Sequence, residues 1–120
     1  MADLNQATEL AKALVKTANE AGCATTALIT DMNQPLAPAM GNALEIVEAM
    51  RVLSGETVGR LRSITVSLGA EILKAQKIYN NISQATTELE RNLNSGAALK
   101  KFSEMISLMG GPINFGQDFN

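Results

Sequence analysis

The residues best suited to chemistry lie in one stretch, residues 30–45, which reads TDMNQPLAPAMGNALE. It places two prolines and a glycine between two acidic side chains. Backbone carbonyl groups on a proline-stiffened loop, next to an acidic helix start, can bind a hard cation. The stretch also follows a segment typical of a strand, and open α/β sheets bind ligands where their strands end. Spacing alone favours a plainer alternative, a rigid connection whose acidic groups cap the next helix.

Other side chains offer little catalytic chemistry. Histidine, the commonest general base and metal ligand, is absent from the sequence. We expect Cys23 to be a small buried hydrophobic residue, because no neighbour in the sequence would activate its thiol. Asp31 is expected to form a turn where a strand ends, with a ligand role as the alternative. The cationic residues that could bind phosphate are too dispersed to form one site: Arg60, Arg62, Lys100 and Lys101.

Composition excludes several classes of protein. The 120 residues are 46% hydrophobic but only 3% aromatic, which favours a core of aliphatic side chains between helices. A net charge of −2 provides no basic face for nucleic acid. No apolar run approaches the roughly 20 residues that span a bilayer, and no signal-peptide pattern opens the chain. The single cysteine indicates a reducing compartment, so we expect a cytoplasmic protein.

The first fifty residues predict a helix, a strand, a loop and a second helix. Apolar residues recur at helical spacing over residues 4–21, with Asp3 as the cap and Gly22 as the stop. Residues 23–30, CATTALIT, are uncharged and rich in β-branched side chains, as in a strand that is buried on both faces. After the loop, Asn42 is predicted to cap the next helix.

The second half of the sequence is helical throughout. Glu45 would complete the cap begun by Asn42, and Gly55 would end that helix. Three further apolar stripes predict helices over residues 61–72, 85–93 and 99–109, with Ser83 as the cap of the middle one. The predicted fold class is mostly α, with about five helices and one or two short strands. Since a lone strand leaves polar backbone unpaired, it should pair with a second copy or with a sheet outside this sequence.

The stretch TTALITDMNQPLAPAMGNALEI closely resembles a signature segment of the thymidine phosphorylase and pyrimidine-nucleoside phosphorylase family. Softer similarity extends to the helix before it (ATELAKALVKTANEAG), the helix after it (RLRSITVSLGAEIL) and the later pattern SGAALKKFSEMISLMGGPINF. The resemblance implies a homodimeric enzyme that splits pyrimidine nucleosides with phosphate into free base and pentose 1-phosphate. Its family fold combines a small helical domain with a larger α/β domain of the nucleoside phosphorylase and phosphoribosyltransferase-like type.

Within that fold, residues 1–120 look like a single partial domain, the middle of the α/β domain, without a second domain. The sequence lacks the family's Lys-His-Ser-Thr-Gly-Gly phosphate loop, and nothing in it matches the Arg, Ser and Lys that hold the pyrimidine. No catalytic or substrate-binding residue can therefore be transferred to this chain. We expect the chain to be inactive alone, with nucleoside and phosphate as ligands only of a full-length enzyme.

The resemblance does imply a partial potassium site. Members of the family can bind potassium at a place built partly from the signature, and the matching ligands here are the carbonyl oxygens of Leu36 and Ala39 and the carboxylate of Glu48. The other ligands would come from the absent phosphate loop, and no other cofactor is required. The alternative for Glu48 is an exposed side chain or one paired with Arg51.

A second class of function is a stand-alone helical module that self-associates or binds a partner without catalysis. Unpaired strand edges and apolar helix faces would favour association in either case, so we expect a homo-oligomer. Nucleic acid and membrane are not expected partners. The preference between thymidine and uridine is left open by this sequence.

Overall fold

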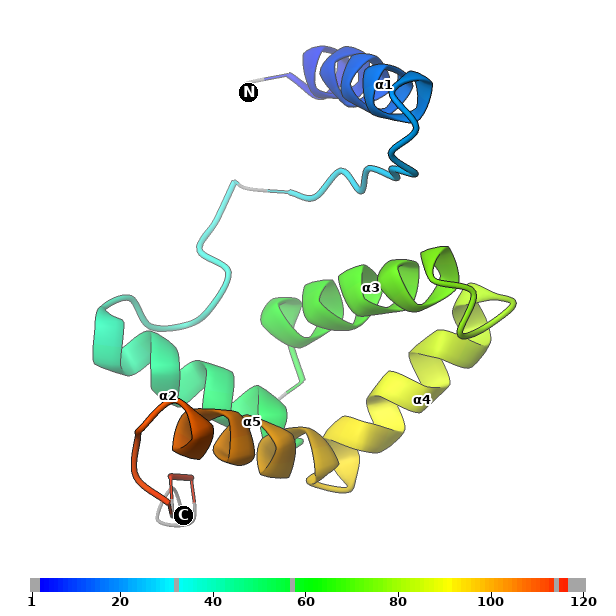
Figure 1. Cartoon of the computed structure of the whole chain (residues 1–120). Coiled ribbons are helices and arrows are strands. Elements are labelled where there is room, and N and C mark those ends of the chain that lie inside the picture. Colours follow the sequence, from blue (N-terminus) through cyan, green and yellow to red (C-terminus); the bar gives the residue numbers. More distant parts are fainter. Residues whose placement is uncertain (1–2, 32, 57, 114, 117–120) are drawn as a thin grey trace.

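The computed structural model describes residues 3–31, 33–56, 58–113 and 115–116. Within these residues the chain forms five α-helices, which confirms the predicted mostly helical class (Figure 1). Their bounds are α1 Leu4–Glu20, α2 Asn42–Leu53, α3 Arg60–Ala75, α4 Ile82–Asn94 and α5 Ala97–Leu108.

The prediction of one or two short strands is wrong for the described residues. Residues 23–31, called here the linking segment, run as coil from α1 toward the following loop (Figure 1). A strand needs a hydrogen-bonded neighbour, and no described part of this chain supplies one. The side chain of Asn19 in α1 takes the place of a neighbouring strand at a single residue of the linking segment, Thr25. Its side-chain amide donates to the carbonyl of Thr25 at 3.1 Å and accepts from the Thr25 N–H at 3.0 Å.

Two of the predicted helix caps are displaced by one or two residues. Asp3 caps α1 as expected, since its carboxylate accepts from the Asn5 N–H at 2.9 Å. Asn42, however, is the first residue of α2, and the cap is Gly41, whose N–H donates to the Glu45 carboxylate at 3.3 Å. In α4 the cap is Asn81 rather than Ser83. Asparagine accepts from the Gln84 N–H at 2.9 Å, which a side chain two residues later cannot reach.

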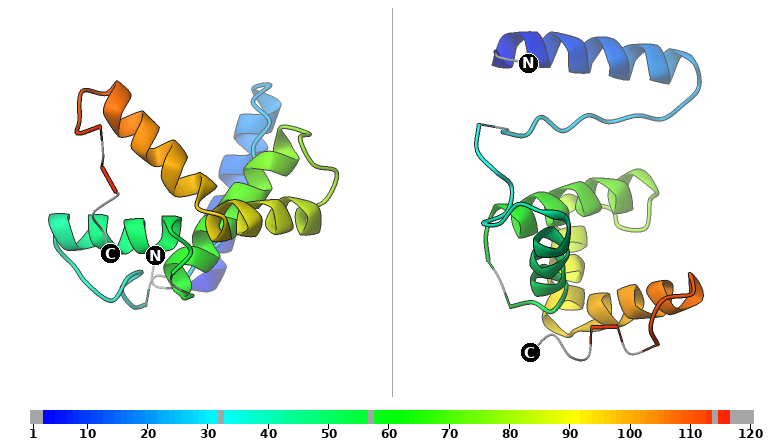
Figure 2. Two further views of the ribbon diagram at one scale, coloured as in Figure 1. Left: turned by 90° about the horizontal axis from the view of Figure 1, so that it is seen from below. Right: turned by 90° about the vertical axis from the view of Figure 1, so that its left-hand side faces the viewer.

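The packed part of the molecule is the group formed by α2 to α5. Its core cluster contains Val52, Val66 and Leu93, one residue from each of α2, α3 and α4. In Figure 1 and in the right-hand view of Figure 2, α1 lies on the far side of the linking segment from this group. All buried residues of the described chain belong to α2, α3 and α4, whereas Leu4, Leu10 and Leu14 of α1 are exposed. The aliphatic core expected from composition is therefore confined to this helical group.

Gly55 lies just after the end of α2, close to the backbone at the end of α4. Its φ of +81° lies in the left-handed region, and a Cβ atom there would come within 2.9 Å of the Leu93 carbonyl oxygen. The close approach involves backbone atoms, which cannot move aside as a side chain would. The stop predicted at this glycine is thus also a packing requirement.

Gly55→Ala is expected to lower the free energy of unfolding by about 2 kcal/mol, because it combines left-handed strain with a backbone clash. Gly96→Ala is the matched control: its φ is +74°, but nothing lies near the added Cβ. The control substitution should lower the free energy of unfolding by only about 1 kcal/mol. Urea unfolding followed by circular dichroism measures both, and equal costs would show that the contact with Leu93 is unimportant.

None of the described helices has both the length and the apolar character needed to cross a membrane.

Candidate functional site

The proline-containing loop, residues 33–41, begins at a turn formed by Asp31. The Asp31 carboxylate accepts the backbone N–H of Asn33 at 2.9 Å and its side-chain amide at 2.6 Å. This is the turn-forming role predicted for Asp31, although no strand precedes it in the described chain. The other end of the loop is joined to α2, where Gly41 bonds to Glu45.

Arg60, the first residue of α3, contacts the same aspartate from 29 residues away. Its Nη2 donates to the Asp31 carbonyl oxygen at 2.5 Å, and its Nη1 lies 3.4 Å from the Asp31 carboxylate. The Asn33 amide, followed by the positive charge of Arg60, holds the pKa of Asp31 below its ordinary value. Asp31 is therefore ionised near neutral pH and holds the start of the loop to α3.

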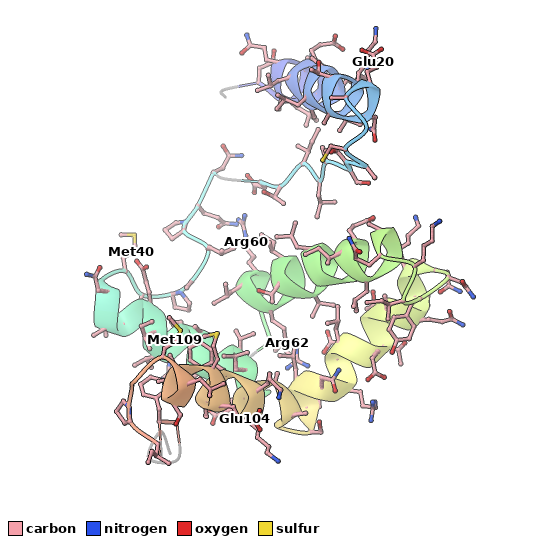
Figure 3. The ribbon with its side chains drawn as sticks, in the orientation of Figure 1. Glu20, Met40, Arg60, Arg62, Glu104 and Met109 are labelled. Atoms are coloured by element: carbon pink, nitrogen blue, oxygen red, sulfur yellow. The ribbon has the colours of Figure 1, made fainter. Side chains whose placement is uncertain are left out.

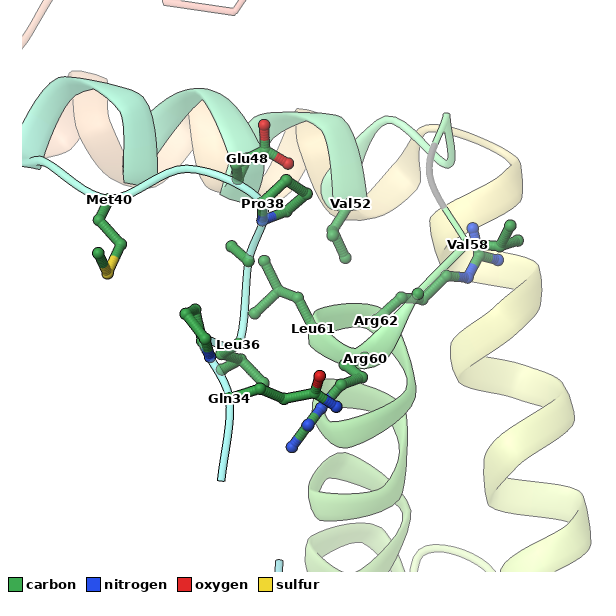
Figure 4. A pocket seen from close by; sticks show the side chains of 13 residues that line it. Gln34, Leu36, Pro38, Met40, Glu48, Val52, Val58, Arg60, Leu61 and Arg62 are labelled. Carbon is green, nitrogen blue, oxygen red and sulfur yellow. The ribbon is translucent and has the colours of Figure 1, made fainter. Parts of the chain in front are cut away.

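A cavity of about 490 Å³ lies between this loop, α2 and α3 (Figure 4). Glu48 and Val52 reach it from α2, and Arg60 and Leu61 reach it from α3 (Figure 4). The loop contributes one polar residue, Gln34, and otherwise apolar ones: Pro35, Leu36, Ala37, Pro38 and Met40. The wall is mostly apolar, with a few polar groups from the helices, as in many small-molecule sites.

The three residues predicted to bind potassium lie around this loop. Leu36 and Glu48 line the same cavity. Ala39 lines a neighbouring cavity of about 340 Å³, which Leu36 shares and Glu48 does not. Leu36 therefore shares one cavity with Glu48 and the other with Ala39.

Glu48 is buried on α2, and its carboxylate accepts a hydrogen bond from Arg51 Nη1 at 2.8 Å. The sequence left two alternatives for Glu48 besides a ligand role. Pairing with Arg51 occurs, whereas the exposed side chain is wrong. Arg51 is itself 51% exposed, so its guanidinium can move into water if another cation binds the carboxylate. No cluster of three acidic, histidine or cysteine side chains that could hold a metal ion occurs among the described residues.

Arg62 is a structural residue that the sequence did not reveal. Its side chain is 9% exposed and extends from α3 toward the end of α4 (Figure 3). Its guanidinium donates to Glu90 at 3.0 Å, to Asn94 at 2.6 Å and to the Gly55 carbonyl at 3.3 Å. In the sequence, Arg62 stood out only as one of four cations too dispersed to form a phosphate site. Because Glu90 and Asn94 are 28 and 32 residues away, no local pattern could indicate the contacts of Arg62 with them.

The model of the glycosyl transferase family, a/b domain, matches residues 2–99, which is more than half of the chain. The chain belongs to this family. Several thymidine phosphorylases are similar to nearly the whole chain. Those of Rhizobium meliloti and Agrobacterium fabrum are 45% and 44% identical to it over 116 residues, 96% of the chain. That of Burkholderia lata is 42% identical over 113 residues, 93% of the chain.

The chain spans about a quarter (26%) of the length of these relatives, so it corresponds to part of each one. This confirms the resemblance to thymidine phosphorylase. As a member of the family, the chain carries its α/β-domain sequence in helices and coil over the described residues.

The remaining residues considered in the sequence lie outside the cavity. Cys23 is exposed at the start of the linking segment, which corrects its predicted burial, since the sheet that would have covered it is absent from the described residues. Lys100 and Lys101 are exposed on α5, where Lys101 pairs with Glu104. Of the four cations considered in the sequence, Arg60 and Arg62 line the cavity beside the loop, whereas Lys100 and Lys101 do not.

Proposed function

We propose that this chain is part of a thymidine or pyrimidine-nucleoside phosphorylase, an enzyme that transfers the pentosyl group of a nucleoside to phosphate. The products are free pyrimidine and pentose 1-phosphate. The observation that carries the proposal is 42–45% identity to thymidine phosphorylases across nearly the whole chain. Residues 1–120 would be the middle of the α/β domain, with the phosphate and base contacts supplied elsewhere. The single cysteine fits a reducing cytoplasm, where we expect the enzyme to act.

A chimeric enzyme tests this proposal. The 116-residue stretch of the Rhizobium meliloti enzyme that aligns with this chain is replaced by the matching residues of this chain. If the stretch is a competent phosphorylase segment, thymine release should stay within roughly tenfold of the parent, or about 1.4 kcal/mol of transition-state stabilisation. Material is prepared from a host that lacks the endogenous enzyme. A folded chimera that releases no thymine would contradict the proposal.

Within that enzyme, the loop would help to hold a potassium ion through the carbonyl oxygens of Leu36 and Ala39 and the carboxylate of Glu48. The donor chemistry fits, because all three are oxygen ligands and the one carboxylate is buried beside the loop. Two prolines restrict the conformations of the free loop, so the loop loses less conformational entropy when an ion binds. When bound, the ion would supply positive charge that joins this loop to ligands from another segment.

Glu48→Gln in the chimera is expected to raise the potassium concentration for half-maximal rate about tenfold, because an amide oxygen attracts a cation less than a carboxylate does. In the isolated chain the same change should alter the melting temperature little, with or without potassium, since the remaining ligands are absent. Sodium in place of potassium controls for ionic strength. A large potassium-dependent rise in melting temperature that Glu48→Gln abolishes would show that the isolated chain holds a complete site.

We also expect the isolated chain to form a dimer or a higher oligomer. Leu10 and Leu14 of α1 and Leu28 and Ile29 of the linking segment are all more than 40% exposed. Apolar area of this kind favours association, and the linking segment leaves backbone groups free to pair with a second copy. Light scattering across micromolar concentrations measures the mass. A sharp monomer peak at every concentration would overturn this expectation.

A further inference from the structure

The loop of residues 33–41 is fixed at its start by a continuous chain of hydrogen bonds. Arg60 donates to the Asp31 carbonyl, and the Asp31 carboxylate in turn accepts the Asn33 backbone N–H. Arg60 is 28% exposed, and it lines both the cavity beneath the loop and a second cavity beside the linking segment. One guanidinium therefore joins α3, the end of the linking segment and the start of the loop.

Both ends of the loop are thus fixed to helices that belong to the packed group. Arg60 begins α3, and Gly41 joins the loop to α2, where Glu48 lies one turn farther along than Glu45. Leu36 and Ala39 lie between these two anchors. Prolines at 35 and 38 fix φ at two positions of the intervening backbone, which reduces the freedom of the loop to absorb a displacement at either anchor.

We propose that Arg60 is a positioning residue, which sets the carbonyl groups of Leu36 and Ala39 relative to Glu48 through its two contacts with Asp31. This inference rests on the proposed cation site. A guanidinium suits the task, because its planar fork can donate to a backbone carbonyl and to a carboxylate at once. Lysine offers a single charged centre and cannot reproduce both contacts in the same geometry.

The first test uses the isolated chain and needs no bound ion. In Arg60→Met, hydrogen exchange at the Asn33 amide and at the loop amides should become about tenfold faster, because local opening is no longer opposed by the Asp31 contacts. The exchange rates in Arg60→Lys should lie between those in Arg60→Met and those in the unaltered chain. Arg91→Met on α4, which removes an exposed arginine paired within its own helix, is the matched control and should leave the loop unchanged.

The second test uses the chimera and direct binding. Arg60→Met should weaken thallium(I) binding, used as a potassium probe, about tenfold, and should raise the potassium concentration for half-maximal rate by the same factor. Saturating potassium should recover the lost rate, which a general loss of folded protein would not allow. Circular dichroism checks the helix content. If Arg60→Met does not fold, Asp31→Asn, which keeps the shape and removes the charge, is measured for the same two shifts.

The outcomes separate the two proposals. Loop exchange that is unchanged in a folded Arg60→Met chain would overturn the positioning role while leaving the cation site intact. Faster exchange with unchanged thallium binding would show that Arg60 orders the loop without serving the site, which also overturns the inference. A chimera that binds no thallium before any substitution would refute the proposed cation site, and this inference with it.

Discussion

Thymidine and phosphate incubated with the isolated chain should release thymine at a rate more than about a hundredfold below that of a full-length relative. Phosphorolysis needs a bound phosphate dianion, a clamp on the pyrimidine and positive charge near the developing base anion. Holding reactants in one geometry can lower a barrier by roughly 7–11 kcal/mol, and a partial site forfeits most of this gain.

The structure supports the expected loss of rate. The larger of the two cavities described beside the loop is mostly apolar, and its two arginines are already engaged, Arg60 by Asp31 and Arg62 by Glu90. Neither guanidinium is therefore available to hold a phosphate without breaking a contact that orders the fold. Binding of one reactant alone would leave the second one unpositioned.

Chromatography of free thymine measures the reaction, with the Rhizobium meliloti enzyme as the positive control. The chain must come from a host that lacks its own phosphorylase, because trace contamination would mimic weak activity. Turnover within a hundredfold of the control, from such material, would contradict the prediction and would require a second set of phosphate ligands in this chain.

The second large effect concerns the buried contact between Arg62 and Glu90. Glu90→Ala is expected to lower the free energy of unfolding by about 3 kcal/mol, because it leaves a buried guanidinium without its counter-charge. Arg62→Met should cost less, about 1–2 kcal/mol, since methionine fills the volume. Glu90 is 39% exposed, so without Arg62 its carboxylate can be hydrated.

A double-mutant cycle measured by urea unfolding tests this asymmetry. The variant that combines Arg62→Met with Glu90→Ala should be more stable than Glu90→Ala alone, because the unpaired charge has been removed. Arg91→Met, next to Glu90 and paired on the surface of the same helix, should change stability by no more than about 0.5 kcal/mol. If Arg62→Met lowers the free energy of unfolding as much as Glu90→Ala does, the unpaired buried charge is not the main cause of the loss.

Local patterns were sufficient for much of this fold. The helical spacing, the Asp3 cap and the left-handed Gly22 fixed α1 to within one residue, because each depends on neighbours within a turn or two. The turn at Asp31 was predictable for the same reason, since its partner Asn33 is two residues away. The signature around residues 25–46 pointed to the family, which the match to residues 2–99 confirmed.

Tertiary structure decided the features that depend on distant partners. The β-branched residues 23–30 favour an extended backbone, but a strand also needs a neighbour, and none occurs in the described chain. Arg60 and Arg62 look alike in the sequence, two residues apart on one helix. Only packing of α3 against the linking segment and α4 gives one of them Asp31 and the other Glu90. Such pairings form across 28 or 29 residues, a separation at which sequence spacing carries no geometric information.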